Sequence, residues 1–244
     1  PQSVNHPQYW HTLPRRHGDM VRTGGGSAAN DLISMGTHVG THIDSLAHVS
    51  QDGKLYGGAS AADSCIGGKY VSHGVHTIPP FFGRGVLIDV ATFKGVDCLP
   101  GGYEITQADL EGALQAAGIT LESGDTVMIR SGWGGRFGDY RGYMGAETGV
   151  PGIGEAAAKW LVGFHPFAIG ADSTALEVIS AEKGHGELPV HRVLLVEQGI
   201  YIIETLNLEE LSQCGRGEFV LSYTPLNLYG ATGSPIRPLA LIEE

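Results

Sequence analysis

Cysteine is scarce in this chain of 244 residues, which contains Cys65, Cys98 and Cys214 and no others. The three are odd in number, far apart, and in no CxxC spacing, which argues against a disulfide framework and against a zinc ribbon. Such cysteine usage is typical of a reducing compartment, and we therefore expect a cytoplasmic protein.

Basic residues are also few: 15 Lys and Arg stand against 26 Asp and Glu, giving a formal net charge of −11. No dense run of Lys and Arg occurs, so we expect neither nucleic acid nor a membrane surface as a partner. No apolar run approaches the roughly 18 residues that a membrane-spanning helix requires.

Two common catalytic motifs are missing as well. The chain has no G-x-S-x-G, and RSGWG at 130–134 lacks the strand, serine and helix context of a serine-hydrolase nucleophile. The glycine-rich stretch at 134–142 lacks the G-K-[ST] of a phosphate-binding loop. These absences direct attention to other kinds of chemistry.

Glycine, in contrast, is abundant, with 38 residues scattered without a period, which predicts a loop-rich fold. A hydrophobic content of 42% and a charged content of 17% are typical of a globular protein. With no internal repeat and no break in composition, we expect an irregular N-terminal segment over 1–30 and a single domain over 31–244.

The local patterns predict an α/β fold. ITQADLEGALQAAGI at 105–119 predicts a helix that Thr106 caps and Gly118 ends, and a second helix is expected at 152–164. Extended or apolar segments are expected at 31–43, 83–91, 124–133, 166–173, 191–211 and 217–230. Because these elements do not alternate strictly, neither a Rossmann nor a TIM topology is predicted.

Ligand-type side chains gather in HVGTHIDSLAH at 38–48, where all of them occupy even positions: His38, His42, Asp44 and His48. The odd positions from 37 to 43 carry β-branched residues. On a strand the even side chains would share one face and the odd ones would face a core, an arrangement that a helix does not allow. A flat strand spaces them about 6.6 Å apart, so the backbone must bend, and Gly40 can supply the bend.

Imidazole and carboxylate groups without a thiolate suit Zn²⁺ and also admit Mn²⁺. The alternative is a histidine-rich surface loop without a ligand. For isolated histidines elsewhere in the chain a structural role is the simpler interpretation, and we expect it for His73, His76, His165 and His185.

The stretch from His38 to His48 resembles the HxGTHxDxPxH signature of the cyclase / kynurenine formamidase / isatin hydrolase family. Segments at 79–91, 124–133, 151–161 and 191–211 also look like family segments, so the resemblance covers roughly residues 35–230. The chain departs from the signature at Leu46, where the family has Pro, and at Val49, where Phe is common. We expect both departures to affect substrate identity more than the class of reaction.

The resemblance implies a metal-dependent hydrolase that opens a cyclic or aryl-linked amide. It implies a compact swivelling β/β/α domain with a central mixed sheet flanked by helices, usually in a dimer or tetramer. His38, His42 and Asp44 would bind the principal ion, and His48 would transfer protons. His191 and Glu204 match positions that hold a second ion together with Asp44, so one or two divalent ions are expected per chain.

Within that family, an isatin hydrolase-like activity on a small-molecule amide is the interpretation we favour. Arylformamidase activity, a cyclase or dehydratase, and a non-hydrolytic metal-binding protein are the alternatives. His191 could equally lie in a plain loop, and Glu204 could meet solvent at the end of a strand. Asp172 is a candidate pocket residue at a strand end, whereas Trp133 is expected to pack at a pocket edge.

Overall fold

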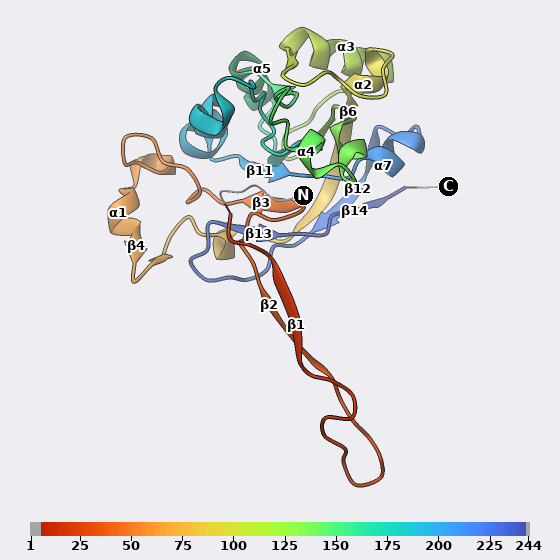
Figure 1. Cartoon of the computed structure of the whole chain (residues 1–244). Helices are drawn as coiled ribbons and strands as arrows, with labels where there is room; N and C mark the ends of the chain where they lie inside the picture. Colours follow the sequence, from red (N-terminus) through yellow and green to blue (C-terminus); the bar gives the residue numbers. More distant parts are fainter. Residues whose placement is uncertain (1–5, 243–244) are drawn as a thin grey trace.

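The computed structural model describes residues 6–242, and its centre is a mixed sheet of eight strands in the order β13-β3-β11-β10-β8-β6-β12-β14 (Figure 1). Four neighbouring strands run parallel: β6 (Phe81–Asp89), β8 (Thr126–Arg130), β10 (Ala168–Ala171) and β11 (Tyr201–Glu204). The flanking pairs are antiparallel and involve β3 (His42–Asp44), β13 (Gly233–Pro235), β12 (Glu218–Tyr223) and β14 (Leu239–Leu241). The predicted α/β class with a central mixed sheet is confirmed.

The helices connect these strands. They are α1 (Ala61–Ser64), α2 (Val90–Phe93), α3 (Gln107–Ala117), α4 (Tyr140–Tyr143), α5 (Glu155–Val162), α6 (Pro189–His191) and α7 (Glu209–Gln213). A π-helical segment, η5 (Arg192–Gln198), continues α6. Helix α3 has the predicted ends, since Thr106 and Asp109 form a capping box and Gly118 takes a left-handed conformation.

Strand alternation divides the core into two layers on the two faces of the sheet. Val86 and Ile88 of β6 face α3, α5 and η5, and together they bury one large apolar cluster. Leu87, between them, faces the opposite side and packs with Met128 of β8 and Leu221 of β12. The helices therefore cover one face of the parallel strands, while the curled sheet encloses the other cluster.

The extended segment predicted over 31–43 forms two separate strands in the structure. Its first part forms β2 (Asn30–Ser34), the backbone bends with a φ of +64° at Gly40, and β3 begins only at His42. The reason is pairing: β2 pairs with β1 (Trp10–Arg15), whereas β3 lies between β11 and β13 of the main sheet. A single straight strand could not join both sheets.

The expected irregular segment over 1–30 was wrong for β1, which forms an antiparallel hairpin with β2. Residues 1–5 of that segment lie outside the described part of the chain. Figure 1 shows the hairpin projecting away from the body. The partner of β1 lies about twenty residues along the chain, across a long turn that contains Gly18 and Gly24, so no short turn motif announced the pairing.

Two further ribbons complete the fold. The strands β4 (Cys65–Ile66) and β5 (Lys69–Tyr70) are antiparallel, and β7 (Glu104–Ile105) and β9 (Gly152–Ile153) are parallel. Within residues 6–242, no helix has the length and apolar character needed to cross a membrane.

Candidate metal centre

The central part of the site lies where β3 and β11 pair. His42 stands opposite Glu204, and Asp44 stands two residues further along β3 on the same face. Ile43 points to the other face, where it is fully buried with Ile203. The predicted alternation of ligands and core residues is therefore confirmed for His42–Asp44, and it places three ligand-type side chains together.

Because the backbone bends at Gly40, the side chain of His38 lies beside that of Asp44. Nδ1 of His38 lies 2.6 Å from Oδ1 of Asp44, and its Nε2 lies 3.0 Å from the hydroxyl of Thr232. Nδ1 of His42 donates to the carbonyl oxygen of Gly40 at 2.8 Å. Nε2 of His42 is thereby left as the ligand atom, 3.5 Å from Asp44 and 3.4 Å from Glu204.

His191 reaches the site from the end of α6. Its Nε2 lies 3.1 Å from Oε1 of Glu204 and 3.7 Å from Oδ2 of Asp44. Its Nδ1 donates to Oε1 of Glu177 at 2.5 Å, and Glu177 also accepts the backbone N–H groups of Val190 and His191, each at 3.1 Å. The structure thus brings His191 and Glu204 to the other predicted ligands.

Glu177 is a residue that the sequence interpretation missed. It is 1% exposed and holds the imidazole of His191 from the side opposite the site. The only signal in the sequence is a single carboxylate within the apolar stretch ALEVIS, because an acidic residue buried in such a setting needs a partner.

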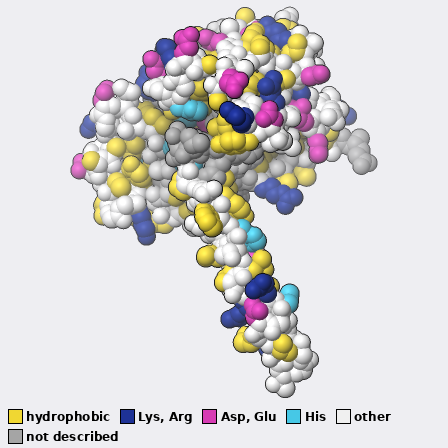
Figure 2. Space-filling model, viewed as in Figure 1, with side chains coloured by type: hydrophobic (Ala, Val, Ile, Leu, Met, Phe, Trp, Pro, Cys, Tyr) yellow, Lys and Arg dark blue, Asp and Glu magenta, His cyan; other side chains and the backbone are white. Residues whose placement is uncertain are grey.

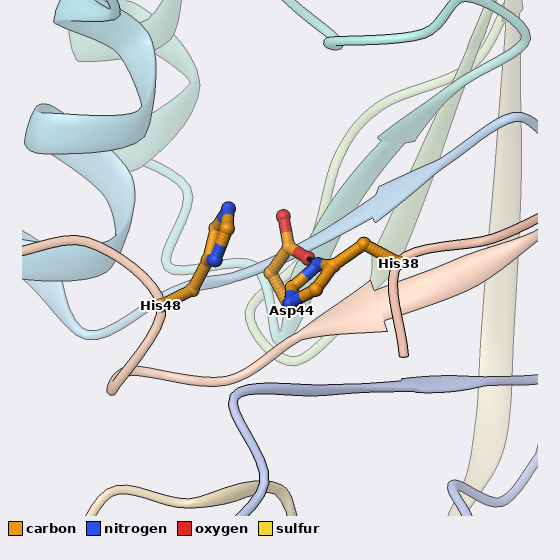
Figure 3. Close-up of side chains that lie close together, drawn as sticks. All are labelled: His38, Asp44 and His48. Carbon is orange, nitrogen blue, oxygen red and sulfur yellow. Dashed lines mark hydrogen bonds and ion pairs between the residues drawn. The ribbon is translucent and has the colours of Figure 1, made fainter. Parts of the chain in front are cut away.

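His48 follows β3 through a turn in which its N–H donates to the carbonyl oxygen of Ser45. Its ring centroid lies 4.1 Å from that of His38 and 6.0 Å from that of His191. Figure 3 shows His38 and His48 on either side of Asp44. One ligand atom each of His38, Asp44 and His48 lie within 4.8 Å of one another, and so do those of His42, Asp44 and Glu204.

Asp44 therefore belongs to both groups of three donors, and each group has the composition of a divalent cation site. A second observation, on Asp44 itself, also fits a bound cation. Oδ2 of Asp44 is buried without a hydrogen-bond partner among the described residues. A buried carboxylate oxygen without a partner is strongly disfavoured, and a cation between the two groups would provide the missing interaction.

The charges of the site are strongly coupled. Burial lowers the pKa of His48 to about 4, although Asp44 attracts the charged form. Burial would lower the pKa of His191 as well, but hydrogen bonds with Glu177 and Glu204 outweigh it and raise that pKa to about 10. For Asp44 the nearby histidines outweigh burial and hold the pKa well below its usual range. A cation would replace protons here, because ligands bind metals in their deprotonated forms.

The side chains of the site that line a pocket of about 200 Å³ are His38, His42, His48, His191 and Glu204. The pocket is also lined by mainly apolar or weakly polar groups: Tyr143, Met144, Thr174, Ala175 and Leu188. The hydroxyl of Thr174 is buried without a partner among the described residues. His185, for which we expected a structural role, also lines the pocket.

Asp172 and Trp133 form hydrogen bonds with Tyr143, which lines the pocket. The carboxylate of Asp172 accepts the N–H and the hydroxyl of Ser131, at 3.0 and 2.6 Å, and it does not line the pocket. The indole of Trp133 donates to the carbonyl oxygen of Tyr143 at 2.8 Å, while the hydroxyl of Tyr143 donates to the carbonyl oxygen of Asp172 at 2.9 Å. Both residues therefore position Tyr143, which does line the pocket.

The two departures from the family signature lie away from the pocket. Leu46 and Val49 are partly buried and pack against the large apolar cluster beneath the helices. Neither lines the pocket beside the metal donors. Both side chains therefore contact the core and not the pocket, and their expected effect on substrate identity stays a prediction.

The sequence comparisons agree with the motif. A family model named Cyclase matches residues 3–178. Isatin hydrolase of Roseibium aggregatum is 30% identical over 215 residues, which are 85% of this chain and 73% of that protein. Cyclase-like protein 3 of Oryza sativa subsp. japonica is 27% identical over 219 residues, and the match spans 87% of this chain and 66% of the rice protein.

Solved structures share the fold. A crystal structure of a novel cyclase is 34% identical, with a TM-score of 0.88 over 99% of this chain and 84% of that one. An isatin hydrolase bound to the product analogue thioisatinate is 24% identical, with a TM-score of 0.73 over 98% of this chain and 83% of that one. With the family model covering well over half of its residues, the chain belongs to the Cyclase family.

Proposed function

We propose that this protein is a metal-dependent amidohydrolase that opens a small cyclic or aryl amide, in the manner that the name isatin hydrolase describes for its relative. One observation carries the proposal above the others: the buried Oδ2 of Asp44 has no partner among the described residues, although it lies beside imidazoles and a carboxylate that line a pocket. Such a site is built for a cation next to a ligand.

His38, His42 and Asp44 would hold the principal ion, and His191 and Glu204 would complete a second site with Asp44 if two ions are bound. Zn²⁺ or Mn²⁺, in one or two copies per chain, fits these donors. A bound ion of this kind lowers the pKa of water and polarises a carbonyl group. The donors' burial excludes bulk water from all but the pocket side.

His48 is the residue proposed to move the proton. It lies beside the donors on a turn and also lines the pocket, so that its ring can reach both a water and the substrate nitrogen. In this role it accepts a proton during attack on the amide and returns it to the leaving nitrogen as the C–N bond breaks. Its imidazole therefore ends the cycle in the state in which it began.

The pocket itself supports a small substrate. Its volume is about 200 Å³, and Tyr143, Met144 and Leu188 are among the side chains that line it. Both features suit a compact ring with little charge. These features favour isatin-like ring opening over the processing of a long or highly charged molecule.

Two alternatives use the same residues. An arylformamidase would release formate from an N-formyl aryl amine, and a cyclase or dehydratase would remove water, as the names of the cyclase-like relatives suggest. The products separate these activities: ring opening adds one water and yields a single acid, deformylation yields two products, and cyclisation loses one water. A metal-binding protein without catalysis would turn over none of these compounds.

The proposal is tested by elemental analysis of the purified protein, together with a screen of cyclic and N-formyl aryl amides read by mass spectrometry. We expect bound Zn or Mn and a product that has gained one water, and we expect Asp44→Asn to lose both. A protein that holds no transition metal and leaves every amide intact would overturn the proposal. A cytoplasmic location is part of it, and the free thiols of Cys65, Cys98 and Cys214 are consistent with that.

A further inference from the structure

Glu204 is the candidate metal ligand that ends β11, and its carboxylate is buried. Figure 2 shows many acidic side chains on the surface of the body, whereas Glu204 is 6% exposed. A buried carboxylate is costly unless it is held against its partners, which here are His42 and His191. The contacts that fix the direction of Glu204 therefore matter for the metal centre, and they begin at the next residue, Thr205.

Thr205 has an unusual backbone conformation. Its φ is +59°, in the left-handed region, and it is the β-branched residue among the five described residues other than glycine that have a positive φ. This conformation is unfavourable for a β-branched side chain and persists only where surrounding contacts hold it. Thr205 is also 7% exposed and lines the pocket beside the metal donors. Backbone strain at such a place indicates a role in the site.

Three hydrogen bonds hold the bend at Thr205. Its N–H group donates to the carbonyl oxygen of Ser173 at 2.9 Å, and the N–H group of Leu206 donates to that of Ala171 at 3.0 Å. The carbonyl oxygen of Thr205 accepts the hydroxyl of Thr41 at 2.6 Å. The bend is thus fixed from the segments on both sides of β11.

The hydroxyl of Thr41 acts where two ligand-bearing strands meet. His42 stands opposite Glu204 in the pairing of β3 with β11. Thr41 precedes His42 and Thr205 follows Glu204, so the hydrogen bond between the two threonines lies directly beyond the last pair of the ladder. One side-chain contact therefore joins the two segments that carry these candidate ligands.

The bend also decides which side chains face the pocket. On a regular strand Glu204 and Leu206 would share one face, and Ile203 would lie on the other. In the structure Leu206 is 3% exposed and packs in the same apolar cluster as Ile203. Both flank Gly170 of β10, where an added Cβ would lie 2.9 Å from Cδ1 of Leu206 and 3.0 Å from Cβ of Ile203. The left-handed residue thus places Leu206 in the core and leaves the space beyond Glu204 to the pocket.

We propose that Thr205 is a positioning residue: its left-handed backbone, held by the hydroxyl of Thr41, directs the carboxylate of Glu204 into the metal centre. This role rests on the proposed metal-dependent function. Because Leu206 is anchored in the core and β11 in the sheet, the bend between them fixes where Glu204 lies. Without the hydroxyl of Thr41 the strained bend relaxes, and the carboxylate shifts away from the other donors.

Thr41→Val removes the hydroxyl and keeps the shape of the side chain. We expect it to lower the affinity for Zn²⁺ by about 10–100-fold, the usual effect of losing support behind a metal ligand. Competition with a chromophoric chelator measures the affinity. Thr41→Ser keeps the hydroxyl and should bind Zn²⁺ as the wild type does. Thr205→Asn should do the same, because asparagine tolerates the left-handed region.

Thr126→Val is the matched control for a purely structural effect. Thr126 is fully buried on β8, and its hydroxyl shares a hydrogen bond with that of Tyr223 at 2.9 Å, away from the pocket. Thr126→Val and Thr41→Val should each lower the melting temperature of the metal-free protein by about 2–4 °C, since each loses one hydrogen bond inside the protein. Thr41→Val alone should also lower the affinity for Zn²⁺.

A double-mutant cycle connects the effect to Glu204. In a Glu204→Gln background, Thr41→Val should lower the affinity little further, because the carboxylate that it positions is gone. Equal losses in both backgrounds, an equal loss in Thr126→Val, or a loss in Thr41→Ser or Thr205→Asn would each overturn the positioning role. Unchanged affinity in Thr41→Val would do so as well and would leave the metal centre standing. A wild type that binds no divalent ion would overturn the metal centre itself, and the positioning role with it.

Discussion

Glu177 accepts a hydrogen bond from Nδ1–H of His191 at 2.5 Å, on the side of the imidazole that faces away from the candidate metal centre. This contact selects the tautomer in which Nε2 carries the lone pair, and Nε2 is the atom that faces Glu204 and Asp44. A carboxylate behind a ligating histidine fixes the ring and increases its basicity. Glu177 thus connects the loop before α6 to the metal centre.

Glu177→Gln is therefore expected to lower metal affinity by about 10–100-fold, the usual effect of losing a carboxylate behind a metal ligand. The amide can still accept the Nδ1–H group, so the fold should persist while the charge is lost. Competition with a chromophoric chelator measures the affinity. Glu187→Gln removes an exposed carboxylate of the same region and should leave the affinity unchanged. Equal affinities for both variants would contradict the assigned role of Glu177.

Chelation provides the second prediction. Dialysis against a strong chelator should abolish turnover of the amide identified in the screen, because catalysis needs the ion, and Zn²⁺ or Mn²⁺ should restore part of it. The fold should also lose stability, since a ligand that binds only the folded state stabilises it. Turnover and melting temperature are measured before and after dialysis. A fully active protein in which mass spectrometry detects no metal would refute metal dependence.

The number of ions is the third prediction. If His191 and Glu204 complete a second site with Asp44, Glu204→Gln should reduce the metal content from about two ions per chain toward one. Elemental analysis against a measured protein concentration gives the ratio. A ratio of one in both the wild type and the variant would mean that one ion suffices, and the hydrolase proposal would survive with a single site.

Substitutions of His38 and His48 should differ in their effects on metal content and turnover. His38→Ala should lose metal, whereas His48→Ala should keep metal and fold but lose turnover by about 10²–10⁴, the usual contribution of general acid–base catalysis. The closeness of His48 to His38 and Asp44 makes this a demanding test. If His48→Ala loses metal instead, His48 is a ligand, and the proton-transfer group must be another pocket residue such as His185.

The capping box of α3 gives a prediction about stability. Burial would raise the pKa of Asp109, but hydrogen bonds from Lys94 and Thr106 outweigh it and lower the pKa below its ordinary value of 3.8. A lowered carboxyl pKa contributes stability that is fully present above the unfolded pKa and is lost as pH falls through the folded one. Asp109→Asn should therefore destabilise the protein by about 1–2 kcal/mol at neutral pH and by less below pH 3.8.

Urea unfolding of the wild type and Asp109→Asn at several pH values measures this difference. Glu111→Gln, on the exposed side of the same helix, is the control and should change stability little at any pH. A difference between the wild type and Asp109→Asn that stays constant with pH would show that the charge of Asp109 is not the cause.

Local sequence determined a large part of this protein. Strand alternation placed His42 and Asp44 on one face and Ile43 on the other, since side chains alternate wherever a strand forms. Thr106 and Gly118 fixed the ends of α3 by contacts within a few residues. The bend at Gly40 was predictable for the same reason, because three donors on a flat strand lie too far apart to share an ion.

Tertiary structure decided the rest. Glu177 lies behind His191 at the metal centre, and Leu46 packs against the core, through contacts between segments distant in the sequence. The closeness of His48 to His38 and the hairpin of β1 and β2 also depend on how separate segments pair. Short-range patterns constrain dihedral angles and faces, whereas the relative positions of remote side chains are set by the sheet order and by the burial of both apolar clusters, which no local pattern contains.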